Sequence, residues 1–87
     1  MGRYRVLIKT SAAREIEAVD QKKDRQRVVC RIQSLAENPR PPGYEKLSAQ
    51  GDKHRIREGH YRIVYPIEEK DRLVHVVKVG HRKDVYR

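Results

Sequence analysis

Hydrophobic and polar residues alternate at the start of the chain. Between residues 3 and 9, every second residue is apolar and the residues between them are mostly basic, which is the period of a half-buried strand. Over residues 12–19 and 22–37 the apolar residues instead recur three or four positions apart. These two segments are therefore predicted to be amphipathic helices. Thr10 and Ser11 precede the first of them and are expected to cap it.

The second half of the chain is predicted to form strands. Residues 38–52 hold three of the four prolines and two of the five glycines, so they are expected to form a loop. Residues 53–57, 61–67 and 72–79 are rich in β-branched and aromatic residues and are separated by short polar turns, which predicts three strands. The resulting order, β-α-α-β-β-β, predicts an α+β fold: a single small domain in which a pair of helices covers one face of an antiparallel sheet.

The turn between the first two of these strands determines which residues face each other. Taking Glu58 and Gly59 as a two-residue turn pairs Arg57 with His60 and Arg55 with Arg62. Because side chains alternate between the two faces of a strand, one face of the hairpin is apolar and is expected to meet the helices: Ile56, Tyr61, Ile63, Tyr65 and Ile67. The other face is basic: Lys53, Arg55, Arg57, His60 and Arg62. Like charges directly opposite each other destabilise a sheet by up to about 1 kcal/mol, which favours a phosphate-binding surface over the alternative of a merely solvated basic face.

The charge of the whole chain strengthens this interpretation. The 87 residues include 21 Lys and Arg against 12 Asp and Glu, a formal net charge of +9. A chain of this length builds one small core, which excludes a two-domain enzyme. A folded domain with such an imbalance repels itself, and a polyanion is the partner that usually explains it. We therefore expect nucleic acid or the ribosome as the target, with an acidic protein or a simple solubility effect as alternatives.

Several kinds of chemistry have no support in the sequence. The one cysteine, Cys30, cannot form an intrachain disulfide, and the four histidines lack the spacing of a metal site. Glycine-rich phosphate loops and nucleophile motifs are also missing, so we expect neither a metal nor a cofactor. No apolar run is long enough for a membrane span or a signal peptide, which predicts a cytoplasmic protein without a membrane partner.

Three stretches of the sequence, together with the order of elements, resemble one known family. They are NPR…KL at residues 38–47, KHRIREGHYRIVYPI at 53–67 and VGHRKDVYR at 79–87. This combination resembles the RelE/ParE superfamily of toxin-antitoxin toxins, on the RelE side. The resemblance implies one RelE-like toxin domain over residues 1–87 and a ribosome-dependent endoribonuclease that cleaves mRNA in the ribosomal A site. It also implies a cognate RelB-like antitoxin, whose contacting segment should be acidic or amphipathic and should contain a helix.

The family's catalytic residues carry over onto this sequence one by one. They fall on Lys53, Arg55, Arg62, Arg82 and Tyr86. Attack of an RNA 2′-OH on the adjacent phosphate needs a base, an acid and positive charge near the phosphate. Lys53 is the preferred base, because the arginines around it disfavour its protonated form, and His81 is a candidate acid. Arg62 and Arg82 would hold the phosphate, and Tyr86 would stack on a nucleobase or bond near the 2′-OH. Arg55 departs from a well-studied branch that has lysine there, and arginine is a poor base.

A second set of residues is expected to bind RNA or the ribosome without taking part in the chemistry. These residues are Arg57, His60, His81, Lys83, Lys22, Lys23, Arg27 and Arg31. The last four lie toward the polar face of the second predicted helix. Two other functions remain open within the same superfamily. One is a ParE-like toxin that inhibits DNA gyrase, and the other is an inert RelE-like protein that acts only as a binding module with its antitoxin.

Overall fold

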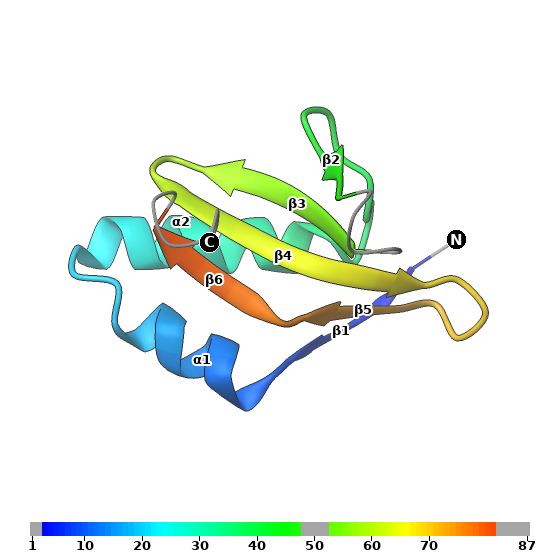
Figure 1. Ribbon diagram of the computed structural model, residues 1–87, viewed down its shortest axis with the longest axis horizontal. Coiled ribbons are helices and arrows are strands. Elements are labelled where there is room, and N and C mark those ends of the chain that lie inside the picture. The colour runs from blue at the N-terminus through cyan, green and yellow to red at the C-terminus, as the bar shows by residue number, and fades with distance from the viewer. Residues whose placement is uncertain (1–2, 48–52, 82–87) are drawn as a thin grey trace.

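The computed structural model describes residues 3–47 and 53–81, which form two helices and a six-stranded, mostly antiparallel sheet (Figure 1). The elements are β1 (Arg5–Ile8), α1 (Thr10–Glu17), α2 (Lys22–Ser34), β2 (Glu45–Lys46), β3 (Lys53–Glu58), β4 (Tyr61–Glu68), β5 (Leu73–Val76) and β6 (Lys78–His81). The expected α+β fold is confirmed, and the strands differ from the expectation in two places. The short strand β2 lies in a segment expected to be a loop, and the last expected strand is divided into β5 and β6.

The two helices pack on one face of the sheet, as expected. α2 runs behind β3 and β4 in the view of Figure 1, and α1 lies beside β6. The core consists of the apolar residues between these layers: Ala12, Ile16, Val28, Ile32, Leu35, Ile56, Ile63, Tyr65, Ile67, Val74, Val76 and Val79. The apolar face assigned to the hairpin is therefore buried, and Tyr61 packs against this core while partly buried. Within the described residues, no helix is long and apolar enough to cross a membrane.

The start of α1 is set by a contact with the sheet. Its N-cap is Lys9, without a side-chain hydrogen bond, so the expectation that Thr10 or Ser11 caps the helix is wrong. The N–H of Lys9 donates to the carbonyl of Val76 on β5 (2.8 Å), which holds Lys9 in an extended conformation. Its own carbonyl then accepts the first helical hydrogen bond, from Ala13 (2.9 Å). The helix therefore starts as soon as the strand ends.

The end of α2 lies before the expected boundary at residue 37. After Ser34, the N–H groups of Leu35, Ala36 and Glu37 donate to carbonyls three residues back. This is the pattern of a 3₁₀-like last turn, which commonly closes α-helices. Leu35 remains fully buried, so the periodicity that predicted the longer helix was correct about the buried face.

The order of strands in the sheet is β1-β5-β4-β3-β2, with β6 also beside β4. β1 pairs with β5 in parallel, from Arg5 opposite Leu73 to Ile8 opposite Val76. The sheet is antiparallel as expected except for this one pair. Alternating residues identify a strand but not its direction, and here the chain between β1 and β5 returns to the same edge in the same direction.

A bulge separates β5 from β6. Ile67 pairs with Val74, and Val64 pairs with Lys78. Two residues of β4 therefore face three residues of the partner segment, which is the definition of a β-bulge. Pro66 lies in this stretch of β4 and has no N–H to donate to a regular ladder. The bulge changes the alternation, so that Val79 points into the core after Val76.

The turn of the β3–β4 hairpin is one residue later than expected. Glu58 pairs with Tyr61, so Gly59 and His60 form the turn, and Gly59 has a positive φ of 61°. Each partner therefore shifts by two residues, and Arg62 lies opposite Arg57 instead of opposite Arg55. Because a shift of two residues preserves the alternation, the strand residues are assigned to the correct faces, whereas His60, expected on the basic face, lies in the turn.

Candidate functional site

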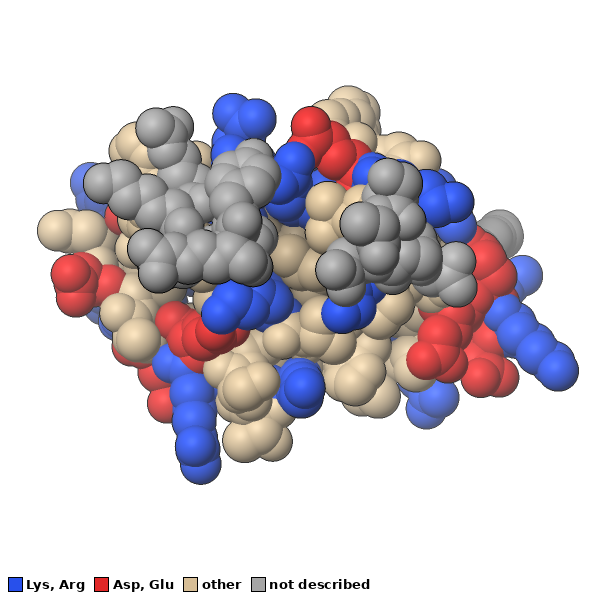
Figure 2. Space-filling model, in the orientation of Figure 1, with Lys and Arg blue, Asp and Glu red and all other residues tan. Residues whose placement is uncertain are grey.

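A row of basic residues lies on the face of the sheet that the helices leave open. Arg57 and Arg62 face each other across β3 and β4, and Lys53 and Arg55 follow on the same side of β3. Figure 2 looks onto this face of the molecule, where Lys and Arg side chains are exposed over the strands. The structure therefore brings together four of the residues predicted from the sequence. We call these four residues, Lys53, Arg55, Arg57 and Arg62, the basic row.

Arg62 is the most enclosed member of the basic row, since the residue is only 5% exposed. It is opposite Arg57 on one side and opposite Gly80 of β6 on the other. Gly80 has no side chain, so nothing from β6 occupies the neighbouring position on this face. Burying a guanidinium is unfavourable unless its charge is compensated. A guanidinium held in such a position is fixed in place, and it can interact with an anion such as a phosphate.

Glu45 is a site residue that the sequence did not single out. Its Oε1 accepts a hydrogen bond from Nε of Arg55 (2.9 Å) and is also contacted by Nη2 of the same guanidinium. Arg55, and to a smaller extent Arg57 and Arg62, lowers the pKa of the Glu45 carboxyl below its usual range. Glu45 precedes Lys46 in β2 and faces Arg55 through the pairing of β2 with β3. Only that pairing reveals it, because β2 lies in a segment rich in proline and glycine.

His60 and His81 lie together at the end of the hairpin, outside the basic row. Their rings are stacked with centroids 6.0 Å apart, and the ring of His81 meets Tyr61 edge-on at 5.8 Å. His81 is opposite Tyr61, whereas Gly80 is opposite Arg62. The alternation of β6 therefore directs His81 to the helix side of the sheet.

The other aromatic cluster has a structural role. His54 is 5% exposed and lies between Tyr44 and Tyr65, with ring centroids 5.7 and 5.8 Å away. The hydroxyl of Tyr65 donates to the carbonyl of Pro39 (2.7 Å), and burial raises the pKa of Tyr65 to about 12. This cluster attaches the segment after α2 to the sheet.

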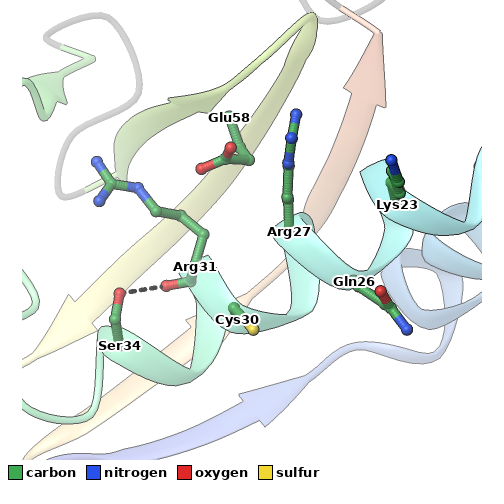
Figure 3. A pocket seen from close by; sticks show the side chains of 7 residues that line it. All are labelled: Lys23, Gln26, Arg27, Cys30, Arg31, Ser34 and Glu58. Atoms are coloured by element: carbon green, nitrogen blue, oxygen red, sulfur yellow. Dashed lines mark hydrogen bonds between the residues drawn. The ribbon is translucent and has the colours of Figure 1, made fainter.

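The basic residues of α2 form a separate group. Lys22, Lys23 and Arg27 are exposed and Arg31 is half-buried, and the last three line a groove with Glu58 at the end of β3 (Figure 3). This groove lies on the helix side of the sheet, so the structure does not join these residues to the basic row. Arg82, Lys83 and Tyr86 lie outside the described residues.

The basic row has the chemistry of an anion site. Its cations can bind a phosphodiester and stabilise negative charge that develops on it. Lys53 in the basic row and Glu45 beside it are the candidate groups for proton transfer. Glu45 is a weaker base than an ordinary carboxylate, because its pKa is lowered. In the described part of the chain, no cluster of three or more His, Cys, Asp or Glu side chains could hold a metal ion.

Comparisons with known proteins agree with this geometry. Residues 6–86 match the family model described as the ParE toxin of the type II toxin-antitoxin system parDE. No curated protein sequence matches significantly. Among solved structures, the archaeal RelE–RelB complex from Pyrococcus horikoshii is similar, with 27% identity and a TM-score of 0.80. The match covers 92% of this chain and 96% of that one.

Bacterial toxins have the same fold. The isolated Escherichia coli RelE toxin is 25% identical with a TM-score of 0.76, and the match covers 95% of this chain and 90% of that one. The YoeB/ParE toxin from Agrobacterium tumefaciens shares the fold at 14% identity, with a TM-score of 0.74 and coverage of 88% and 96%. The chain therefore belongs to the RelE/ParE superfamily, as a toxin of a type II toxin-antitoxin system.

Proposed function

We propose that this toxin is a ribosome-dependent endoribonuclease, which cleaves mRNA in the ribosomal A site by attack of a 2′-OH on the adjacent phosphate. The observation that carries the proposal is the buried Arg62 within the basic row, on an open face of the sheet. A toxin that acted only by docking to a protein would not need a guanidinium fixed beside two other arginines. Fixed cations are what stabilise the charge of a phosphorane, because they need no reorganisation during the reaction.

Each residue has a role in this proposal. Arg62 and Arg82 stabilise the charge that develops on the phosphate, and Arg55 and Arg57 hold the flanking backbone. Lys53 removes the proton from the 2′-OH. Tyr86 contacts the substrate nucleotide. For Arg82 and Tyr86 the support is the resemblance of the C-terminal sequence to RelE-like toxins.

The need for the ribosome follows from what the described residues of this face lack. A lysine and an ion-paired carboxylate are a poor acid-base pair for free RNA at neutral pH. Holding the RNA strand in a reactive geometry can supply much of the missing rate, and the ribosome is the object that holds mRNA in this way. The toxin would then act in the cytoplasm on translating ribosomes. The similar structures that contain RelE with RelB support an antitoxin as the partner that keeps it inactive.

Inhibition of DNA gyrase is the second candidate, because the matching family model is that of ParE toxins. One experiment separates the two functions. The purified toxin is added to a purified translation system with and without ribosomes, and mRNA cuts are mapped by primer extension, while gyrase supercoiling is measured in parallel. Ribosome-dependent cuts with normal supercoiling support the proposal. Loss of supercoiling without cuts supports the ParE-like function, and no effect in either assay supports an inert binding module.

A further inference from the structure

The open face of the sheet has a second half, beyond the basic row, that is largely apolar. Val74 and Val76 of β5 belong to the core, and Val6 of β1 packs against it. Because side chains alternate, the residues between them point to the open face. These residues are Leu73 and His75 on β5 and Arg5 and Leu7 on β1. Figure 2 shows mostly uncharged side chains over β5 and β1.

Strand pairing places part of this apolar half in line with Lys53. Lys53 is opposite Pro66, the pairing of β4 with β5 brings Pro66 beside His75, and His75 is opposite Leu7. Neighbouring strands are about 4.8 Å apart, so Pro66, His75 and Leu7 form a line about 10 Å long that begins next to Lys53. We call these three residues the platform.

The platform can be reached from solvent. Leu7 is 48% exposed, and Pro66 and His75 are half-buried. Within residues 3–47 and 53–81, the imidazole of His75 makes no hydrogen bond or ion pair, and its nitrogens are not among the buried atoms without a partner. Covering Leu7 with a flat ligand would remove apolar surface from water, which favours binding.

Cations lie at both ends of the platform. Lys53 is at one end, and Arg5 and Lys9 are two residues before and after Leu7 at the other end, both exposed. Glu68 lies one step further along β4, outside the platform. Single-stranded nucleic acid binds to surfaces of this kind, because its bases stack on flat side chains while Lys and Arg contact its phosphates.

The same charges argue against a second copy of the chain as the ligand. A second copy would bring Arg5 and Lys9 close to cations of the same kind, and like charges across an interface are unfavourable. RNA instead brings phosphates to these cations. The platform is also continuous with the basic row, which runs from Arg57 and Arg62 to Lys53.

We propose that the platform binds a nucleobase of the RNA strand whose phosphate lies on the basic row. The base stacks on the imidazole of His75 and contacts Leu7 and Pro66. Lys53 acts on the 2′-OH, which belongs to the nucleotide on the 5′ side of the cleaved bond, and the platform lies beyond Lys53. The bound base is therefore on the 5′ side of that bond. This inference rests on the proposed function and adds a contact that holds the strand in position.

The test compares two RNAs that cannot be cleaved by attack of a 2′-OH. One is 2′-O-methyl hexa-adenylate, and the other has the same sugars and phosphates without bases. Because the charges are equal, the ratio of the two dissociation constants measures what the bases contribute. In competition fluorescence anisotropy, wild-type toxin should bind the RNA with bases at least about fivefold more tightly. Leu7→Ala and His75→Ala should bring this ratio close to one without changing the affinity for the strand without bases.

Two variants serve as controls. Ile8 is the neighbour of Leu7 and is 42% exposed, but it is opposite Val76 and so lies on the other face of β1. Ile8→Ala should therefore keep the wild-type ratio. His75→Phe should also keep it, because a benzene ring stacks on a base without a hydrogen bond or a charge. Thermal unfolding of each variant checks that the fold is retained.

The proposal is overturned if the wild type binds both RNAs equally, if Ile8→Ala and Leu7→Ala lower the ratio to the same extent, or if His75→Phe behaves like His75→Ala. It is also overturned if Leu7→Ala leaves the ratio unchanged but abolishes self-association or weakens antitoxin binding, since the platform would then contact a protein.

Cleavage on ribosomes is measured separately with the same proteins. Cleavage without a base-dependent ratio refutes the platform and leaves the proposed function intact. A base-dependent ratio without cleavage refutes the proposed function and leaves the platform as an RNA-binding site.

Discussion

The ion pair between Glu45 and Arg55 predicts how strongly the toxin should respond to salt when it binds RNA. The side chain of Arg55 is only 14% exposed, while that of Glu45 is 53% exposed. A phosphate that binds Arg55 must therefore compete with a carboxylate that solvent also reaches. Replacing Glu45 by Gln keeps the shape of the side chain and a hydrogen-bond acceptor but removes the competing charge. A phosphate that binds Arg55 then no longer competes with the charge of Glu45.

The size of this effect can be worked out from one charge. For a single strand, the logarithm of the binding constant falls with the logarithm of the salt concentration with a slope of about −0.7 per neutralised phosphate. Removing the competing charge lets about one more phosphate be neutralised, so the slope for Glu45→Gln should be steeper by about 0.7. Binding at low salt should be tighter than in the wild type, and the difference should shrink as salt is added.

The assay is fluorescence anisotropy with a short 2′-O-methyl RNA, which cannot be cleaved by attack of a 2′-OH, over a series of salt concentrations. Glu17→Gln is the matched control, because Glu17 is exposed on α1, on the covered side of the sheet. It changes the net charge by the same amount, and its slope should equal that of the wild type. Equal slopes for all three proteins, or the same change in both variants, would refute the inference that Glu45 competes for Arg55.

Three further predictions concern stability and proton transfer. Tyr65→Phe removes the hydrogen bond to Pro39 (2.7 Å) and should lower the free energy of unfolding by about 1–2 kcal/mol in denaturant titrations. Burial raises the pKa of Tyr65 to about 12, so the stabilisation by its neutral hydroxyl is complete below about pH 10 and is lost as the pH rises toward 12. The free energies of unfolding of wild type and variant should therefore converge near pH 12, and a constant difference between them would contradict this. Gly59→Ala should lower the free energy of unfolding by about 1 kcal/mol, because Gly59 has a φ of 61° although a Cβ would meet no atom within 4 Å; an unchanged value would show that the turn relaxes. Lys53→Arg should fail to restore the cleavage lost in Lys53→Ala, because arginine keeps the charge but does not accept a proton; single-turnover rates against pH measure this, and a wild-type rate for Lys53→Arg would move the base elsewhere.

Much of the fold could be predicted because apolar residues recur at different intervals in its strands and in its helices. Ile56, Ile63 and Tyr65 are buried as the alternation requires, and the helix face with Val28 and Ile32 meets them. The sequence places the hairpin turn one residue early, yet it assigns the strand residues of the basic face correctly, because the partners shift by two residues. Alternation is thus a stronger signal than turn position.

Features that depend on contacts between distant segments could not be predicted in the same way. The bulge opposite Pro66 is visible only when β4 is paired with both β5 and β6. Because of this bulge, His81 lies opposite Tyr61 and not opposite Arg62. The position of His81 in the sequence, next to predicted site residues, therefore does not indicate its place in the structure. Glu45 joins the site through only two paired residues of β2, too few to show any period.

The cleavage rate of Arg62→Ala on programmed ribosomes tests the central claim most directly. Arg57→Ala is the matched control, since it removes the same charge from the position opposite Arg62 but from an exposed side chain. If Arg62 stabilises the transition state, single-turnover cleavage should slow by roughly 10²-fold or more in Arg62→Ala and much less in Arg57→Ala, with ribosome binding and thermal unfolding largely retained by both. Cleavage by Arg62→Ala at the wild-type rate would contradict the account, because it would leave the buried guanidinium without a role in the chemistry.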